Sequence, residues 1–448
     1  MPLIPVFTPE EVKSLRGAID KFRHPGAYES GKWMVSHLNR RADVLGTPFP
    51  AAVTLRDITL RTTEQMPGLV LSPEDRTRLL RAIVETGVPS VQTSAFGRGW
   101  SPEEIRAEVR MVKEINPACE FVYGSASTPD QVALAAKVGI DSVQFWAAPY
   151  AEAAPLFAGA YEKAWKDEDW RTLKFPKAIE DQVEQARRLV LAGKERGVRV
   201  SVGINMLSFA SDEYIAQYCR VMHACGAPEI VLYDGASGVG PEAYAYLVRL
   251  VRQHAPDAAI GVHTHNVFAL GVADALAAAR AGAQVLEVSV NGYCSASGQA
   301  DLAATTVALN ALYGVHTGIR LERLTPLARL AEDITGYRLA WNHPVTGREV
   351  FNWGGTEFVI QELKVDPLIH WCVEPALVGN ERKWDITFDS GPYTMLDKLQ
   401  ALGIRVDPSL VEPILQRVKT EMRQHRRVLT ENEIRAIAVS FQPTATSP

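Results

Sequence analysis

The chain has 448 residues, of which 47% are hydrophobic and 22% are charged, the composition of an ordinary globular protein. Its net charge of −5 gives no long-range attraction for nucleic acid or for an anionic membrane surface, so neither partner is expected. The five cysteines include no Cys-x-x-Cys pair, which indicates neither a disulfide framework nor a cysteine zinc site. Without a signal peptide or an apolar stretch of about eighteen residues, the sequence predicts a cytoplasmic protein.

Residues 1–50 are expected to form an N-terminal extension, made of one helix from about Glu10 and a loop. After it, short β-branched runs alternate with longer amphipathic segments that carry helix start signals such as Ser72-Pro73-Glu74. Eight strand–helix units predict a parallel sheet that closes into a (β/α)₈ TIM barrel over residues 51–316. The expected strands are Val53–Leu60, Ser90–Thr93, Glu120–Tyr123, Ser142–Trp146, Arg199–Ile204, Glu229–Tyr233, Ala259–Thr264 and Ala283–Val288.

Two segments do not fit the regular strand–helix repeat. Residues 147–178 form a long insertion after the fourth strand, and a loop at that end of a barrel is either an active-site lid or a surface excursion. Residues 317–448 are expected to be a mainly helical appendage that covers the barrel mouth or mediates dimerisation. It contains Leu321–Gly336, a Trp/Gly-rich stretch Trp341–Gly379, Thr394–Leu402 and Pro408–His425.

In a TIM barrel, residues at the carboxyl ends of the strands face the active site. Arg61, Asp234 and Asn291 are expected at the ends of strands one, six and eight, and His263 and His265 at the end of strand seven. The two histidines point to one side of their strand, so they suit a divalent metal or a structural hydrogen-bonding role.

Arg61 could clamp a substrate carboxylate or stabilise an enolate oxygen. The alternative is an ion pair between Arg61 and Glu64 that closes the end of the barrel. Asp234 opens a loop rich in glycine and small residues, which makes either a tight turn or a close approach for a ligand.

Four motifs follow one another along the expected barrel: Asp57-Ile58-Thr59-Leu60-Arg61-Thr62-Thr63-Glu64-Gln65-Met66-Pro67-Gly68, the loop Asp234 to Pro241, His263-Thr264-His265-Asn266, and Asn291-Gly292 through Gly298-Gln299. Together they resemble the DRE-TIM metallolyases, which include isopropylmalate, homocitrate and citramalate synthases and hydroxymethylglutaryl-CoA lyase. Asn342–Gly347 and Pro375–Gly379 resemble the post-barrel subdomains of the synthases, so the resemblance covers about residues 50–405.

The resemblance implies a homodimer and a divalent metal (Zn, Mn, Mg or Co) that chelates a 2-oxo acid. That acid would be condensed with an acyl-CoA co-substrate or formed by the reverse cleavage. By the same resemblance, the metal ligands would be His263, His265 and Gln299. The catalytic set would be Arg61 for the oxyanion, Glu64 and Gln65 for positioning the substrate, and Asp234.

The sequence departs from the family pattern at the positions that carry the chemistry. Five substitutions stand out: Thr62 for the metal-binding aspartate, Val267 and Gln299 for an aspartate and an asparagine, Asn205–Met206 for an acid after strand five, and Phe358, near Glu357, for the post-barrel histidine. Losing carboxylate charge should weaken metal binding unless the substrate carboxylates supply the anions. Cys294 resembles the loop cysteine of the lyases with a different spacing, or is a buried thiol.

Three functions follow from these observations. The first is a Claisen-type condensation of an acyl-CoA with a 2-oxo acid. The second is a retro-aldol or Claisen lyase, or a decarboxylase, that acts on a free carboxylic acid without CoA. The third is a non-catalytic barrel that binds a small acid or a partner.

Overall fold

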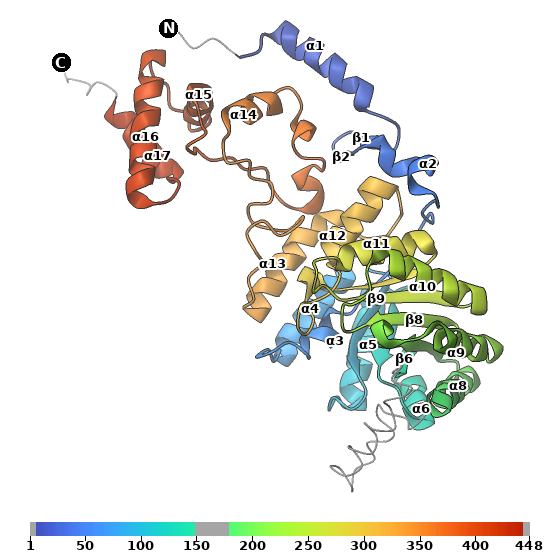
Figure 1. Ribbon diagram of the computed structural model, residues 1–448. Coiled ribbons are helices and arrows are strands. Elements are labelled where there is room, and N and C mark those ends of the chain that lie inside the picture. Colours follow the sequence, from blue (N-terminus) through green and yellow to red (C-terminus); the bar gives the residue numbers. More distant parts are fainter. Residues whose placement is uncertain (1–5, 148–178, 442–448) are drawn as a thin grey trace. The chain divides into compact units, whose positions relative to one another are not determined.

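The computed structural model describes residues 6–147 and 179–441 (Figure 1). The chain divides into two compact units. The barrel unit is Arg40–Leu339, and the terminal unit combines Met1–Asn39 with Ala340–Pro448. The barrel unit extends beyond residues 51–316 at both ends. Arg40 donates to the backbone carbonyls of Asn310, Ala311 and Leu312, and α13 (Leu324–Thr335) contacts α4 (Pro73–Glu85).

Eight parallel strands close the barrel in the order β10-β3-β4-β5-β6-β7-β8-β9, which confirms the predicted TIM-barrel fold. The strands are β3 (Thr54–Asp57), β4 (Ser90–Ala95), β5 (Glu120–Gly124), β6 (Ser142–Ala147), β7 (Arg199–Ile204), β8 (Glu229–Asp234), β9 (Ala259–Thr264) and β10 (Val285–Val288). The helices that surround them in Figure 1 are α4, α5 (Pro102–Ile115), α6 (Pro129–Val138), α8 (Ile179–Arg196), α9 (Asp212–Ala224), α10 (Pro241–His254), α11 (Gly271–Ala281) and α12 (Leu302–Ala308).

The helices begin where the sequence signals them. The side chains of Ser72, Ser101 and Thr128 each accept a hydrogen bond from the backbone of the first turn, and a proline follows each of them. The expected insertion at 147–178 lies almost wholly outside the described residues. Among the described residues, no helix has the length and apolar character needed to cross a membrane.

The first strand is shorter than expected. It ends at Asp57, and the short helix α3 (Thr59–Thr63) follows, so the prediction of a strand over Val53–Leu60 that delivers Arg61 at its end is wrong. The reason is local: the Asp57 carboxylate accepts hydrogen bonds from the backbone N–H and the hydroxyl of Thr59, at 3.0 and 2.9 Å. This side-chain-to-backbone turn competes with further strand pairing. Arg61 is thus carried on a helix just beyond the strand.

The terminal unit is assembled from both ends of the chain. Its N-terminal part holds α1 (Pro9–Ile19) and the short pair β1 (Tyr28–Glu29) and β2 (Trp33–Met34). The backbone of β2 reaches the C-terminal part, where the Met34 N–H donates to the Cys372 carbonyl at 2.9 Å.

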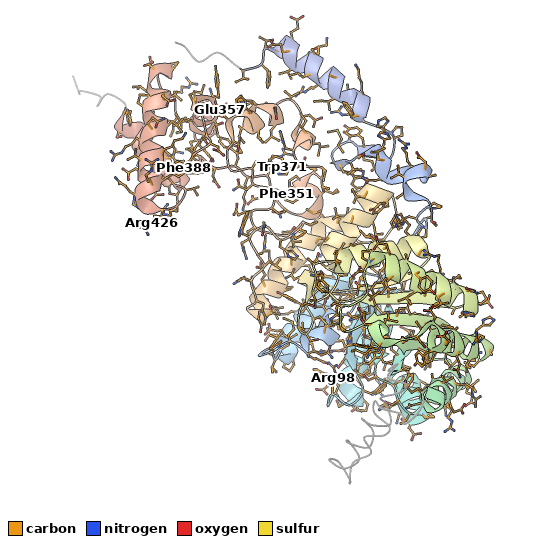
Figure 2. The ribbon with its side chains drawn as sticks, viewed as in Figure 1. Arg98, Phe351, Glu357, Trp371, Phe388 and Arg426 are labelled. Carbon is orange, nitrogen blue, oxygen red and sulfur yellow. The ribbon has the colours of Figure 1, made fainter. Side chains whose placement is uncertain are left out.

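The C-terminal part of this unit has its own apolar core, formed mainly by α15 (Pro392–Ala401), α16 (Val411–His425) and α17 (Glu431–Ser440). One further helix, α14 (Glu357–Leu363), begins with Glu357, which is labelled in Figure 2. The Glu357 carboxylate accepts three backbone N–H bonds at 2.9 Å from the start of α15. It is therefore a helix-capping acid, favoured there by the positive end of the helix dipole.

Candidate active site

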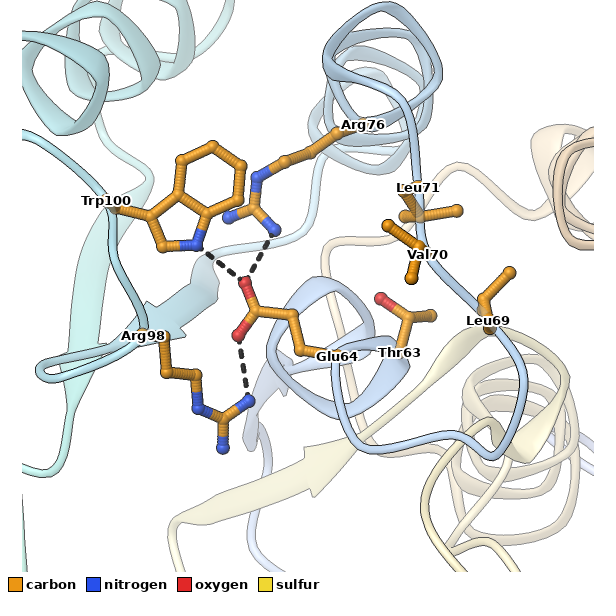
Figure 3. Close-up of a pocket in the computed structure, with 8 residues that line it drawn as sticks. All are labelled: Thr63, Glu64, Leu69, Val70, Leu71, Arg76, Arg98 and Trp100. Carbon is orange, nitrogen blue, oxygen red and sulfur yellow. Dashed lines mark hydrogen bonds and ion pairs between the residues drawn. The ribbon is translucent and has the colours of Figure 1, made fainter.

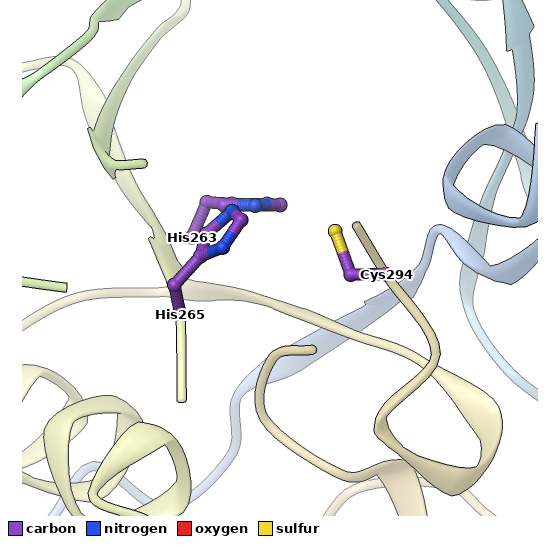
Figure 4. Close-up of side chains that lie close together, drawn as sticks. All are labelled: His263, His265 and Cys294. Atoms are coloured by element: carbon purple, nitrogen blue, oxygen red, sulfur yellow. The ribbon is translucent and has the colours of Figure 1, made fainter. Parts of the chain in front are cut away.

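The two strand-nine histidines meet a cysteine from the loop after β10 at the carboxyl end of the barrel. Ligand atoms of His263, His265 and Cys294 all lie within 4.8 Å of one another (Figure 4). The two imidazole centroids are 4.9 Å apart, and His263 and Cys294 are buried. The closed barrel produces this meeting, because β9 and β10 are neighbouring parallel strands.

A buried carboxylate fixes the ring of His263. The Nδ1 atom of His263 lies 2.9 Å from Oε2 of Glu287, which is fully buried on β10. The other ring nitrogen is left to face the cluster, an arrangement that suits a metal-binding or a proton-transferring histidine.

The electrostatics of the cluster set its protonation. Burial opposes a charge on His263, but its hydrogen bonds to Cys294 and Glu287 prevail and raise its pKa. Burial likewise works against the Cys294 thiolate, yet His263 and the charge of Arg61 lower the pKa of the thiol. Burial, reinforced by His263 and Arg61, lowers the pKa of His265 to about 3, so this ring is neutral at pH 7. His263 and Arg61 thus favour the thiolate form of Cys294.

Arg61 is a buried guanidinium with spare donors. Its side chain is 5% exposed, and its Nε and Nη2 atoms have no hydrogen-bond partner among the described residues. Its Cζ atom lies 5.2 Å from the centroid of the Trp146 ring, and a long bond of 3.4 Å joins Nη1 to Gln65, which is itself exposed. An anionic ligand would satisfy the two free nitrogen donors.

Glu64 does not pair with Arg61, so the expected alternative ion pair between them is not formed. Its carboxylate accepts instead from Arg76, Arg98, Ser94 and Trp100 at 2.8–3.0 Å. Figure 3 shows three of these bonds on the wall of a pocket of about 370 Å³. Glu64 therefore ties α3 to the segment after β4, and its acceptor positions are filled by the protein.

Thr62 and Gln299 occupy two of the positions where the expected metal ligands differ from the family pattern. The Thr62 hydroxyl is fully buried and lies 2.7 Å from the carbonyl of Tyr293, to which it donates. Gln299 is 1% exposed, and neither atom of its amide has a partner among the described residues. An isolated bridge places Gln299 beside His265. Two imidazoles, a thiol and an unpartnered amide fit a divalent cation such as Zn²⁺.

The remaining expected residues lie in supporting contacts. Asp234 ends β8, and its carboxylate accepts from Ser208 and from the backbone of Val239, both at 2.8 Å. Asn291 follows the end of β10 and donates to Tyr293 and to the carbonyl of Ala328. The side chains of Val267 and Phe358 are exposed. The side-chain oxygen of Asn205 accepts a hydrogen bond from the backbone N–H of Met206.

Sequence reasoning missed the polar interior beneath the histidines. The Tyr233 hydroxyl donates to Gln144 at 2.9 Å and lies 3.2 Å from Glu287, and Gln144 donates to Glu287 at 2.6 Å. The signal was a glutamate inside the apolar run Val285–Val288. A charge in such a run indicates a partner inside the barrel.

Comparisons with known proteins give this site its context. The HMGL-like family model matches residues 166–331. A protein of Methanopyrus kandleri named as an (R)-citramalate synthase is 30% identical over 390 residues, which cover 87% of this chain and 72% of that protein. A 2-phosphonomethylmalate synthase of Streptomyces rubellomurinus is 28% identical, covering 82% of this chain and 92% of that protein. Both relatives are named as synthases.

A solved structure supports the fold alone. The hydroxymethylglutaryl-CoA lyase of Pseudomonas aeruginosa superposes with a TM-score of 0.53 at 19% identity, covering 65% of this chain and 95% of that chain. The barrel, the four ordered motifs and the synthase relatives agree with one another. The protein is thus an enzyme that belongs to the HMGL-like family, in the DRE-TIM superfamily.

Proposed function

We propose that the protein condenses an acyl-CoA with a 2-oxo acid in a Claisen-type reaction. The observation that carries the proposal is the buried Arg61 at the barrel mouth, whose Nε and Nη2 have no partner within residues 6–147 and 179–441. Two free donors in a desolvated place suit the carboxylate or the ketone oxygen of an oxo acid. The relatives named as citramalate, homocitrate and isopropylmalate synthases support the same reaction class.

In this reaction the α-carbon of the acyl group loses a proton and forms a bond to the ketone carbon of the oxo acid. The ketone oxygen becomes an alkoxide, and water then cleaves the thioester to release CoA. Arg61 would stabilise the alkoxide or hold the carboxylate, and Glu287 would keep the ring of His263 in place. His263, His265 and Gln299 would hold a divalent cation, which as a Lewis acid would polarise the bound oxo acid.

The test is CoA release with a panel of acyl-CoA and 2-oxo acid pairs, measured with a thiol reagent and by product mass. We expect release that requires both substrates and that is largely lost in the Arg61→Met variant. If no pair yields CoA and a new carbon–carbon bond, the proposal fails.

The second candidate is a lyase or decarboxylase that acts on a free carboxylic acid without CoA. Thr62 stands in the place of an acid, and its hydroxyl is bonded to Tyr293. This replacement favours the second candidate, because the site has less negative charge to hold a metal that prefers oxygen ligands. Following mixtures of free acids by NMR in the presence of the protein would detect such cleavage.

The resemblance to the synthases also leads us to propose a homodimer, with residues 317–448 as a cover or dimerisation region. We further propose that the protein acts in the cytoplasm. Sedimentation of the purified protein tests the dimer. A monomer at all accessible concentrations would contradict it.

A further inference from the structure

We propose that Cys294 is a metal ligand, and that it gives the cluster with His263 and His265 a preference for Zn²⁺ or Co²⁺ over Mg²⁺ and Mn²⁺. The inference deepens the proposed function, on which its catalytic meaning rests. Its geometric basis is the approach of the three ligand atoms to within 4.8 Å of one another.

The donor set is soft. Imidazole nitrogens and a thiolate select Zn²⁺ and related ions, whereas Mg²⁺ and Mn²⁺ prefer carboxylate and carbonyl oxygens. Within the cluster, the thiolate supplies the one negative charge that two neutral imidazoles lack. The hydroxyl of Thr62 cannot supply this charge, because it is a neutral group whose hydrogen is donated to the carbonyl of Tyr293.

The hydrogen bond from Thr62 to the carbonyl of Tyr293 also holds Cys294 in position, since Tyr293 directly precedes Cys294. The loop that carries them is closed on itself, because the Gln299 N–H donates to the carbonyl of Gly292 at 3.0 Å. Gly298 sits at φ +76°, and a Cβ added there would come within 2.4 Å of the Gly292 carbonyl oxygen. The loop therefore presents Cys294 in a fixed place, as a ligand site requires.

A second observation points to a ligand at this place. The side-chain amide of Gln299 is buried beside His265 and lacks any partner among the described residues. A buried amide without hydrogen bonds carries a free-energy cost that coordination of its oxygen would remove. Gln299 would thus add a fourth donor, and a Zn²⁺ or Co²⁺ ion that expands to five ligands would still bind the oxo acid.

The experiment measures metal binding on the full chain, without reference to activity. Protein stripped with a chelator is loaded with Zn²⁺, Co²⁺, Mn²⁺ or Mg²⁺ in turn, and the bound metal is counted by elemental analysis. We expect one Zn²⁺ or Co²⁺ per chain, little Mg²⁺ or Mn²⁺, and a thiolate-to-cobalt charge-transfer band in the near ultraviolet.

Three variants assign the ligand. Cys294→Ser should lose the band and weaken Zn²⁺ binding by more than the ~10–100-fold typical of a lost supporting contact. Cys294→Asp should restore binding with a shift toward Mn²⁺. Cys372→Ser, which removes an exposed cysteine of the terminal unit, should change nothing.

A wild-type cobalt form without the charge-transfer band, or equal Zn²⁺ affinity in Cys294→Ser, would overturn the inference. Circular dichroism and thermal melting of each variant show that the loss is not one of folding. CoA release is assayed separately. CoA release without a thiolate band refutes Cys294 as a ligand and supports the proposed condensation. A thiolate band without CoA release from any substrate pair supports Cys294 as a ligand and refutes the condensation.

Discussion

The guanidinium of Arg61 is buried at the barrel mouth with two nitrogen atoms that no described residue satisfies. A buried guanidinium with unsatisfied donors lowers the stability of the free protein, and binding of an anion removes this free-energy cost. Because a lysine offers a point charge in place of a planar fork, Arg61→Lys should lower kcat/KM for the condensation by about 100-fold or more. Its melting temperature should not fall. Steady-state kinetics and thermal melting check both parts, and an unchanged kcat/KM would remove Arg61 from the catalytic set.

Asp57 makes stability depend on pH. Burial raises its pKa from 3.8 to about 7, although its bonds from Thr59 oppose the shift. The unfolded chain therefore releases this proton first, so stability falls as pH rises from about 4 to about 7 and then levels off.

Asp57→Asn keeps the shape of the side chain and removes the titrating proton of the carboxyl group. Relative to wild type, the variant should gain stability between about pH 5 and pH 8, by at most about 4 kcal/mol over the full window. Urea unfolding at both pH values measures the gain, and comparing the two proteins cancels the other titrating groups. A constant difference between them would show that Asp57 ionises in the native state as it does in the unfolded chain.

At the scale of residues, the sequence predicts which side chains lie at the site better than it predicts which of them contact one another. The pairing of His263 with His265 follows from strand periodicity. The contacts of both with Cys294 and Glu287 do not, because those residues come from the next strand and the loop after it, and closure of the barrel brings them together. Glu64 shows the opposite case, since four donors from other segments outcompete its near neighbour Arg61.

At the scale of elements, the barrel strands share a buried ionic network. Arg56 on β3 binds Glu229 on β8 through two bonds, at 2.6 and 2.9 Å, and also contacts Glu120 on β5 and Glu287 on β10. One side chain thus links four strands inside the barrel, and through Glu287 the network reaches His263.

Arg56→Met should destabilise the barrel by about 3–5 kcal/mol, because it leaves buried carboxylates without a counter-charge. Adding Glu229→Gln should recover part of this loss. The control is Arg78→Met on α4, where the exposed pair with Asp75 should cost about 1 kcal/mol or less. Denaturant unfolding of the four proteins provides the comparison. Equal effects of Arg56→Met and Arg78→Met would show that the network adds nothing beyond a surface pair.

The strands could be predicted from the sequence because buried parallel strands appear as short β-branched runs between helix start signals. The errors fall where side chains bond the backbone. The turn at Asp57 ends β3 early, and Glu357 caps α15 from a distant segment. Neither effect leaves a periodic pattern. Helix α14 lies within the Trp/Gly-rich stretch, where the sequence predicts no helix, whereas α17 does carry a start signal in the capping box of Thr430 and Glu433.

At the scale of the whole molecule, two units with separate cores should unfold separately. Leu415 is 1% exposed in the helical core of the terminal unit, and Leu415→Ala should destabilise that unit by about 2–5 kcal/mol. Hydrogen exchange in the barrel strands should stay unchanged. Leu286→Ala on β10 should give the opposite pattern. Exchange followed by mass spectrometry measures both, and faster exchange throughout the chain in either variant would indicate a single cooperative unit.

The terminal unit also constrains the order of events during synthesis. The segment with β2 leaves the ribosome early, whereas its backbone partner Cys372 is made only after the entire barrel. The barrel can therefore fold first. Trp33, which is almost wholly buried in the finished protein, lacks its C-terminal contacts until later. We therefore expect a nascent chain that stops short of Cys372 to leave this tryptophan more exposed, and so more open to chaperones and proteases, than the finished protein does.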